Sequence, residues 1–469
     1  MKKTWKDRLL MCKVLALISF SLAINKQVDG QCIANTSPTS ANQGETGFSV
    51  TITLGASAPA GETPYLVRLD SLIGTDVERD GTTLTATFSI PSYEATGSKT
   101  LILEFPSQVC TSPAAFTVNA NSFSGTVYYV DPASPGTPPY SGTSWATAFT
   151  NINMALNEVS MAGGGEIWIK KGTYTPNASD RTKSFGLKSG VYLYGGFDGT
   201  ETARSQRDYV NDSTILSGDI GTQGDSTDNS YHVLLGANDA LLDGFYITGG
   251  QSDGELSSRL GGGMYNYNVS PSINNCVFYN NFAEEGGAIY NIQEAAISVV
   301  SNSTFINNNA YKGGAIATRV GAHTYIDGCT FSNNHAAWRG GAIFIDYGAD
   351  PVIINTTINN NTCSDGNGGA IYIDNISSQL NSTAPTFKDV SFSNNSATYR
   401  GGAISIYNNS TDPVVYDCSF TNNSCGVGGG AIAVDSGPKV VVKNATNSSN
   451  SGGTGGNNID NNGGQITNY

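Results

Sequence analysis

Three dipeptides in the second half of the chain place an aromatic ring beside a cation, directly before a Gly-Gly pair. They are Tyr311-Lys312, Trp338-Arg339 and Tyr399-Arg400. Aromatic faces stack on sugar rings, and guanidinium groups pair with carboxylates or sulfates. These residue types in this pattern therefore predict a surface that contacts a polysaccharide or a cell-surface glycan.

The same cations would suit a lyase that acts on an acidic polysaccharide. Such an enzyme needs a cation to neutralise the substrate carboxylate and a base to take the α-proton. Lys312, Arg339 and Arg400 are candidates for these roles, and Asp346 and Asp374 are candidate ligands of a Ca²⁺ ion. A third interpretation is structural, because aromatic-basic pairs often brace turns by cation–π packing.

Catalytic signatures are otherwise missing from the sequence. His232, His323 and His335 fall at unrelated positions, and the residue set of polygalacturonase-like hydrolases is absent. A nucleophile elbow, a metalloprotease helix and a phosphate loop are absent too. We therefore expect a non-catalytic, adhesin-like contact function, with polysaccharide lyase or glycoside hydrolase activity as the alternative and Ca²⁺ as the one candidate cofactor.

A repeat must position these residues. Gly-Gly pairs, each followed by an apolar strand, start at Gly262, Gly286, Gly313, Gly340, Gly368, Gly401 and Gly429. A second motif, Phe-x-Asn-Asn, lies between them at Phe278, Phe305, Phe331, Phe392 and Phe420, with Ile358 replacing the aromatic once. Each period holds two or three extended runs and no amphipathic helix, which predicts a parallel β-solenoid.

Stacked turns of a solenoid align equivalent residues in columns about 4.8 Å apart. The aromatic column reads Phe278, Phe305, Phe331, Ile358, Phe392, Phe420. Two residues earlier the column reads Cys276, Ser303, Cys329, Thr356, Val390, Cys418, and five residues later Ala283, Ala310, Ala336, Cys363, Ala397, Cys425. A charged column reads Arg319, Asp346, Asp374, Tyr407, Asp435. Side-chain size is kept in the first three columns, as a narrow packed interior requires.

The columns also predict the state of the cysteines and asparagines. Cysteines that share a column are at least two turns apart, on the order of 10 Å, beyond the reach of a disulfide. Cys276, Cys329, Cys363, Cys418 and Cys425 are therefore expected to be free, buried and inert. The repeated Asn-Asn pairs indicate structural ladders at turns rather than ligand sites.

The start of the solenoid differs from the repeats. Ser144 is expected to cap a short helix that includes Trp145, Phe149, Ile152 and Leu156. Short strands follow at 166–170, 191–194, 214–217, 232–235 and 241–248. The helix would close the first turn of the solenoid, which we place at residues 126–469.

Residues 31–120 alternate between apolar and polar side chains. One face of 48–54 is apolar, and the stretches 84–90 and 101–105 repeat the pattern. Asp80-Gly81 supplies a tight turn. Half-buried strands of this kind predict an antiparallel β-sandwich, and Cys32 and Cys110 near its ends are expected to form a disulfide in an oxidising compartment.

Two resemblances add to this interpretation. The run Gly-Glu-Thr-Gly-Phe-Ser-Val-Thr-Ile at 44–52 and the Ala-Thr-Gly at 95–97 resemble immunoglobulin-like domains of the IPT type in bacterial surface proteins. The Gly-Gly-Ala-Ile and Phe-x-x-Asn repeats resemble polymorphic outer-membrane proteins and, more broadly, the right-handed parallel β-helices of the pectate-lyase superfamily. The second resemblance implies a surface-displayed passenger that is often adhesive.

Composition and the first thirty residues predict the location. A basic start, an apolar run from Leu9 to Ile24 and the small residue Gly30 are typical of a cleaved signal peptide at 1–30. The formal net charge of −14 argues against nucleic-acid binding. We therefore expect an all-β protein, secreted or at the outer cell surface, with no transmembrane segment after cleavage.

Overall fold

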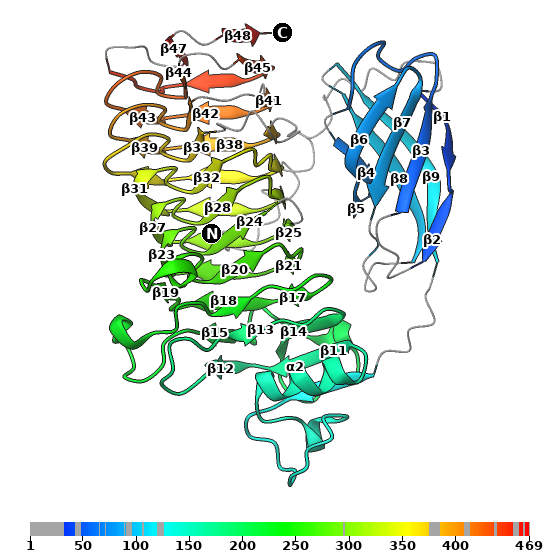
Figure 1. The fold of residues 1–469 in the computed structure, drawn as a ribbon, viewed down its shortest axis with the longest axis vertical. Coiled ribbons are helices and arrows are strands. Elements are labelled where there is room, and N and C mark those ends of the chain that lie inside the picture. Colours follow the sequence, from blue (N-terminus) through cyan, green and yellow to red (C-terminus); the bar gives the residue numbers. More distant parts are fainter. Residues whose placement is uncertain are drawn as a thin grey trace, which may run out of the picture. The chain divides into compact units, whose positions relative to one another are not determined.

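The structure is a computed structural model in which the chain divides into two compact units, Met1–Asn121 and Ser122–Tyr469 (Figure 1). It describes residues 32–42, 48–64, 66–70, 72–88, 90, 96–105, 107–119, 126–293, 296–374, 385–407, 413–435, 439–453, 459–462 and 465–468. The predicted signal peptide and the resembling residues 44–47 and 95 lie outside these ranges. The prediction of an all-β protein is confirmed.

The first unit contains two sheets. One has the order β1 (Ile33–Ser37), β3 (Phe48–Leu54), β7 (Thr83–Phe88), β6 (Thr75–Asp80). The other has the order β2 (Ser40–Asn42), β9 (Val109–Asn119), β8 (Gly97–Glu104), β4 (Leu66–Leu69), β5 (Leu72–Ile73). Side chains of both sheets, among them Ile52, Leu84, Leu103 and Val118, form one buried cluster. The turn predicted at Asp80-Gly81 joins the antiparallel strands β6 and β7.

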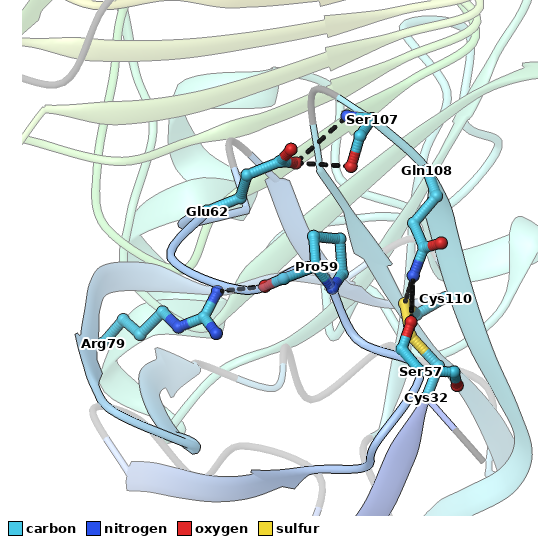
Figure 2. The surroundings of a disulfide bond; sticks show 8 residues. All are labelled: Cys32, Ser57, Pro59, Glu62, Arg79, Ser107, Gln108 and Cys110. Atoms are coloured by element: carbon cyan, nitrogen blue, oxygen red, sulfur yellow. Dashed lines mark hydrogen bonds between the residues drawn. A yellow bond between two sulfur atoms is a disulfide. The ribbon is translucent and has the colours of Figure 1, made fainter. Parts of the chain in front are cut away.

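A disulfide links Cys32 with Cys110, whose Cα atoms are 5.7 Å apart (Figure 2). Cys32 directly precedes β1, and Cys110 lies in β9. The Gln108 Nε2 atom donates a hydrogen bond of 2.8 Å to the carbonyl oxygen of Ser57, beside the disulfide. The disulfide therefore ties the two sheets of this unit together, because β1 and β9 belong to different sheets.

The helix of the second unit starts later than predicted. It is α2 (Ile152–Met161), and Asn151 caps it by accepting hydrogen bonds from the backbone N–H groups of Asn153 and Met154. Ser144 instead precedes the short 3₁₀ turn η1 (Trp145–Thr147), and its hydroxyl contacts the Thr147 hydroxyl without capping a backbone N–H group. The buried face of α2 packs on the first turns of the solenoid as expected.

The remaining helical turns are short: η2 (Arg204–Gln206), η3 (Ser226–Asp228) and η4 (Leu256–Arg259). No helix in the described ranges has the length and apolar character that a membrane span requires.

The described strands of the second unit form four parallel sheets, numbered here in the order in which one turn of the chain visits them (Figure 1). Sheet 1 contains β10 (Val127–Val130), β11 (Gly165–Lys170), β14 (Val191–Phe197), β17 (Leu241–Asp243), β21 (Ser272–Asn274), β25 (Ile297–Ser301), β29 (His323–Asp327), β33 (Val352–Ile354), β37 (Thr386–Lys388), β41 (Val414–Tyr416), β45 (Lys439–Lys443) and β48 (Gln465–Asn468). Sheet 2 contains β12 (Gly172–Tyr174), β15 (Thr214–Ser217), β18 (Phe245–Thr248), β22 (Val277–Tyr279), β26 (Thr304–Ile306), β30 (Thr330–Ser332), β34 (Thr357–Asn359), β38 (Ser391–Ser393), β42 (Ser419–Thr421) and β46 (Thr446–Ser448).

Sheets 3 and 4 flank the Gly-Gly corner of each turn. Sheet 3 contains β19 (Gln251–Ser252), β23 (Phe282–Glu285), β27 (Asn309–Lys312), β31 (His335–Arg339), β35 (Thr362–Cys363), β39 (Ser396–Ala397) and β43 (Ser424–Cys425). Sheet 4 contains β13 (Phe185–Gly186), β16 (Leu234–Leu235), β20 (Met264–Tyr267), β24 (Ile289–Ile292), β28 (Ile316–Arg319), β32 (Ile343–Asp346), β36 (Ile371–Asp374), β40 (Ile404–Tyr407), β44 (Ile432–Asp435) and β47 (Ile459–Asn462). The stretch 241–248, expected as one strand, is divided into β17 and β18 by Gly244, whose φ of 84° turns the chain.

The predicted columns are confirmed by the strand register. Phe305 pairs with both Phe278 and Phe331, and its ring centroid lies 5.2 and 4.6 Å from theirs. Four of the five free cysteines in the described ranges are buried, and the exception, Cys425, is half-buried because it lies near the end of the last strand of sheet 3. Matching side chains therefore stack turn upon turn in one continuous core.

The Asn-Asn pairs form the predicted ladder. The second residue of each pair is buried and donates from Nδ2 to the Oδ1 of an asparagine on the next turn at 2.9–3.0 Å, through Asn281, Asn308, Asn334, Asn361, Asn395 and Asn423. The last acceptor is Asn450, which follows a serine. The first residue, such as Asn333 with φ of 55°, takes the left-handed conformation that asparagine tolerates. Each pair thus supplies a turn and a rung of hydrogen bonds.

The Gly-Gly corner leaves no room for a side chain. A Cβ atom at Gly341 would lie 2.1 Å from the carbonyl oxygen of Gly369 on the next turn. Gly340 has φ of 63°, a left-handed conformation. The corner therefore fixes how sheet 3 meets sheet 4, where the candidate residues lie.

Candidate functional site

The six predicted contact residues lie at the sheet 3 side of the Gly-Gly corner, in or directly after its strands. Lys312 and Arg339 end β27 and β31 and pair in register, and Arg400 follows β39. The rings of Tyr311 and Trp338 stack on each other with centroids 5.5 Å apart. The structure thus brings the three aromatic-basic pairs into one strip along the solenoid.

Each of the three cations is held by a carboxylate. The Lys312 Nζ atom donates to Glu285 Oε1 at 2.7 Å. Arg339 reaches across the corner to Asp374 on sheet 4, with an Nη1 to Oδ2 distance of 2.8 Å. The side chains of this pair are mostly buried, with exposed fractions of 20% and 5%.

Arg400 and Arg319 extend the same network. Arg400 pairs with Asp435 at 2.8 Å and with Asp460 of the following turn. Arg319 bridges Glu285 at 2.6 Å and Asp346 at 3.0 Å. We call this set of residues, from Glu285 to Asp460, the ion-pair ladder.

A floor of buried aromatic rings lies beneath the ladder on the outer side of sheet 4. It consists of Tyr290, Phe344 and Tyr372, which belong to a hydrophobic cluster separate from the core. The Lys312 ammonium lies 5.2 Å from the Phe344 ring centroid, and the Arg339 guanidinium lies 4.6 Å from that of Tyr372. Cations over aromatic faces are stabilised by the ring quadrupole, so floor and ladder brace the corner together.

The outermost layer is an aromatic column on sheet 3. Tyr311 and Tyr399 are 47% and 48% exposed, and Trp338 is partly exposed. The turn between Trp338 and Tyr399 carries Gly366 instead of a ring, and Tyr399 donates from its backbone N–H to the Gly366 carbonyl at 2.9 Å. The column therefore lacks an aromatic ring on the one turn between Trp338 and Tyr399.

Burial raises the pKa of both candidate calcium ligands, Asp346 and Asp374. Desolvation raises the pKa of Asp346 to about 6, although Arg319 opposes this shift, and the neighbouring Asp374 adds to it. Desolvation also raises the pKa of Asp374, against the attraction of Arg339. A Ca²⁺ ion between these carboxylates would have to displace two guanidinium groups, and the described residues contain no group of three or more metal-binding side chains.

Sequence reasoning missed two parts of this site. Glu285 lies in register with Lys312, so its column position could have identified it as the partner. The floor residues Tyr290, Phe344 and Tyr372 each directly follow a Gly-Gly-Ala-Ile motif, which is a second readable signal. By contrast, the pairing of Arg400 with Asp460 links residues two turns apart, and the spacing of the repeats does not predict it.

Residues 260–468 match the family model described as "Right handed beta helix region". With its stacked parallel sheets, the second unit is a right-handed β-helix. No curated protein matches the sequence.

Solved structures with a similar chain include PfbA, a surface adhesin of Streptococcus pneumoniae. The identity is 11%, the match covers 67% of this chain and 89% of that chain, and the TM-score is 0.30. A family 28 exopolygalacturonase of Yersinia enterocolitica is 10% identical over 93% of this chain and 99% of that chain, with a TM-score of 0.26. Neither likeness bears on function.

Proposed function

We propose that the protein is a non-catalytic, adhesin-like contact protein whose β-helix binds glycans through the aromatic column. The observation that carries this proposal is the difference between the cations and the aromatic rings at the Gly-Gly corner. Each cation of the candidate set is engaged by a carboxylate, while the rings of Tyr311 and Tyr399 are about half exposed. Binding then depends on ring faces, and the cations position the strands that carry them.

The charges of the ladder favour neutral parts of a glycan over uronate carboxylates. A lyase needs a cation that is available to the substrate carboxylate and a base that reaches the α-proton. Arg339 is paired with Asp374 and stacked 3.9 Å from the Trp338 ring centroid, so a substrate carboxylate would compete with both contacts. This cost supports binding over catalysis and leaves lyase or hydrolase activity as the alternative.

A glycan array probed with the purified protein tests the proposal. Replacing Tyr311→Ala or Tyr399→Ala should weaken binding about threefold to tenfold, because each change removes one stacking surface. The matched control is Tyr267→Ala, since Tyr267 is similarly exposed on sheet 4 but lies outside the column. Loss of binding in the control alone, or no binding by the parent protein, would refute the contact function.

The catalytic alternative has its own assay. The protein is incubated with uronate, sulfated and neutral polysaccharides. Unsaturated products of a lyase are followed by absorbance, and new reducing ends from a hydrolase are followed by a reducing-sugar assay. We expect no products. Product formation that disappears in Arg339→Ala would establish the lyase instead of the contact protein.

We further propose that the protein is exported and displayed outside the cell. The basic and apolar pattern of residues 1–30 supports a signal peptide. The Cys32–Cys110 disulfide supports an oxidising compartment. The two sheets of the first unit, with their shared buried cluster, support an immunoglobulin-like sandwich of the IPT type that serves as a spacer. The repeats support kinship with polymorphic outer-membrane proteins.

A further inference from the structure

One hollow of the β-helix lies on the outer side of sheet 2, away from the aromatic column of sheet 3. It has a volume of about 510 Å³ and is open to solvent. Its floor includes residues of β12, β15, β18 and β22, among them Thr173, Ser217 and Thr248. Its wall is the loop 218–230, which replaces a sheet 3 strand in this turn and carries η3.

A buried polar atom beside this hollow has no hydrogen-bond partner. Asn229 lines the hollow and is only 7% exposed, yet its Oδ1 atom accepts no hydrogen bond. Nearly all buried polar groups in proteins are satisfied, and an unpaired acceptor costs free energy. The Oδ1 atom itself has almost no exposed surface, so a ligand hydroxyl group in the hollow would satisfy it once the Asn229 amide turns toward the hollow.

The loop holds Asn229 in place without a ligand. Arg181 donates from Nε to the Asn229 carbonyl oxygen at 2.6 Å, and its guanidinium stacks 4.3 Å from the Tyr231 ring centroid. Farther along the loop, Asp219 accepts from the Gly224 N–H at 3.0 Å. A site that is ordered beforehand loses less entropy when it binds.

The lining identifies the chemical class of the ligand. Tyr279 offers an aromatic surface and Ile215 an aliphatic one, and Gln223, Ser226 and Asn229 offer amide and hydroxyl groups. Aromatic faces pair with the C–H face of a sugar ring, and convergent polar groups fix its hydroxyls.

The charged residues of the lining indicate whether the ligand is neutral or anionic. Asp219 is the one charged side chain among the lining residues, and neither lysine nor arginine lines the hollow. An anionic ligand would meet a carboxylate with no compensating cation. The volume lies within the range of about 300–1,000 Å³ that is usual for small-ligand sites.

We propose that this hollow is a binding site for a neutral sugar, with Tyr279 as the stacking surface and Asn229 as a hydrogen-bonding group. The site is separate from the aromatic column, so it stands or falls independently of the function proposed for that surface. The ligand is a neutral hexose or N-acetylhexosamine unit, free or at an accessible position of a glycan.

Saturation-transfer NMR and titration calorimetry on the whole protein test this site. The probes are the methyl glycosides of glucose, galactose, mannose and N-acetylglucosamine, with glucuronate and galacturonate as charged counterparts. At least one neutral glycoside should bind at millimolar concentration, and the uronates should bind more weakly. Binding of none of the neutral glycosides, or stronger binding of a uronate, would overturn the proposal.

Two variants locate the binding. Tyr279→Ala and Asn229→Ala should each weaken the neutral glycoside about tenfold, from loss of a stacking surface and of a hydrogen bond. Tyr279 is partly exposed, so its variant tests the site even if Asn229→Ala unfolds the loop, which circular dichroism would reveal. Tyr267→Ala is the control and should leave this binding unchanged, since Tyr267 is exposed and lies outside both the hollow and the aromatic column. Equal affinity in the Tyr279 variant, or a loss in the Tyr267 variant, would contradict the assignment.

Discussion

At the scale of single residues, buried charge explains what the candidate cations do. Arg339 and Asp374 are mostly buried, and taking both charges out of water is costly unless they stay paired. The pair also lies over the Tyr372 ring, which adds cation–π attraction. The cations therefore stabilise the folded β-helix in the absence of any ligand.

Replacing Arg339→Met should lower the free energy of unfolding of the β-helix by about 1–3 kcal/mol, because it leaves Asp374 unpaired. The double variant with Asp374→Asn should recover part of that loss in a double-mutant cycle followed by guanidinium denaturation. Lys183→Met is the control, since the Lys183–Asp180 pair is exposed and should contribute less than about 1 kcal/mol. Additive effects of the two Arg339–Asp374 changes would show that the pair is not coupled.

Asp346 should make the β-helix less stable as the pH rises. Its folded pKa of about 6 lies above the usual value of 3.8, so the folded state holds the proton more tightly than the unfolded state. The resulting penalty develops between these two pH values and is complete above pH 6, at roughly 2–3 kcal/mol.

The Asp346→Asn variant cannot ionise and should therefore be more stable than the parent at pH 7.5 and lose this advantage near pH 4. Denaturation at both pH values measures the difference. The exposed Asp417→Asn change should move stability by less than about 0.5 kcal/mol at either pH. An Asp346→Asn variant that is less stable at pH 7.5 than the parent would mean that the ion pair outweighs desolvation.

At the scale of the repeated elements, neighbouring asparagines do different work. Asn334 is buried and donates to both the Phe305 carbonyl and Asn361 Oδ1. Asn333 is exposed and supplies a left-handed turn. The ladder holds adjacent turns together, and the turn residue directs the chain from sheet 2 to sheet 3.

Replacing Asn334→Ala should cost about 2–4 kcal/mol, because it removes two donated hydrogen bonds and leaves buried partners unsatisfied. The matched change Asn333→Gly should stay within about 0.5 kcal/mol, since glycine accepts the same backbone conformation. Thermal and chemical denaturation of the two variants compare these costs. Similar losses in both would contradict the division of roles.

The repeats made the fold of the β-helix predictable, whereas the details of the site were less so. Column membership follows from the Gly-Gly and Phe-x-Asn-Asn spacing, which correctly aligned Arg319 with Asp346. The direction of each long side chain does not follow from spacing. Arg339 turns toward Asp374 because the Gly-Gly corner brings sheet 4 within reach, and only the three-dimensional structure shows that contact.

The first turns were harder to predict because they lack the repeat. Ser144 is a good capping residue by type, yet only the 3₁₀ turn η1 follows it, and Phe149 then forms a parallel β-bridge to Val130. The helix can therefore begin only at Ile152, where Asn151 caps it. A tertiary contact overrides the local preference for an earlier start.

At the scale of the whole molecule, each unit has its own buried cluster and its own means of stabilisation. The first unit is closed by a disulfide between residues separated by 78 positions. The β-helix relies on stacked side chains, and its buried thiols Cys276, Cys329 and Cys418 have pKa values raised by desolvation to about 12. Such thiols remain protonated and unreactive in the folded protein.

Reduction should therefore destabilise the first unit selectively. Loss of the cross-link is expected to cost about 4 kcal/mol by the chain-entropy relation, and the unfolding transition of the β-helix should not move. Calorimetry with and without reductant measures both transitions, and the Cys32→Ser/Cys110→Ser variant is the control for direct effects of the reductant. A shift of both transitions would show that the units are coupled.

Cysteine cross-linking on sheet 2 tests the stacking of turns most directly. Ser332 pairs with Asn359 on the next turn, and Asn359 pairs with Ser393 on the turn after it. Oxidation should cross-link the Ser332→Cys/Asn359→Cys variant, because adjacent parallel strands lie about 4.8 Å apart, within the reach of a disulfide. The Ser332→Cys/Ser393→Cys variant spans two turns and should not cross-link. Mass spectrometry that found the second cross-link and not the first would contradict the register on which the site depends.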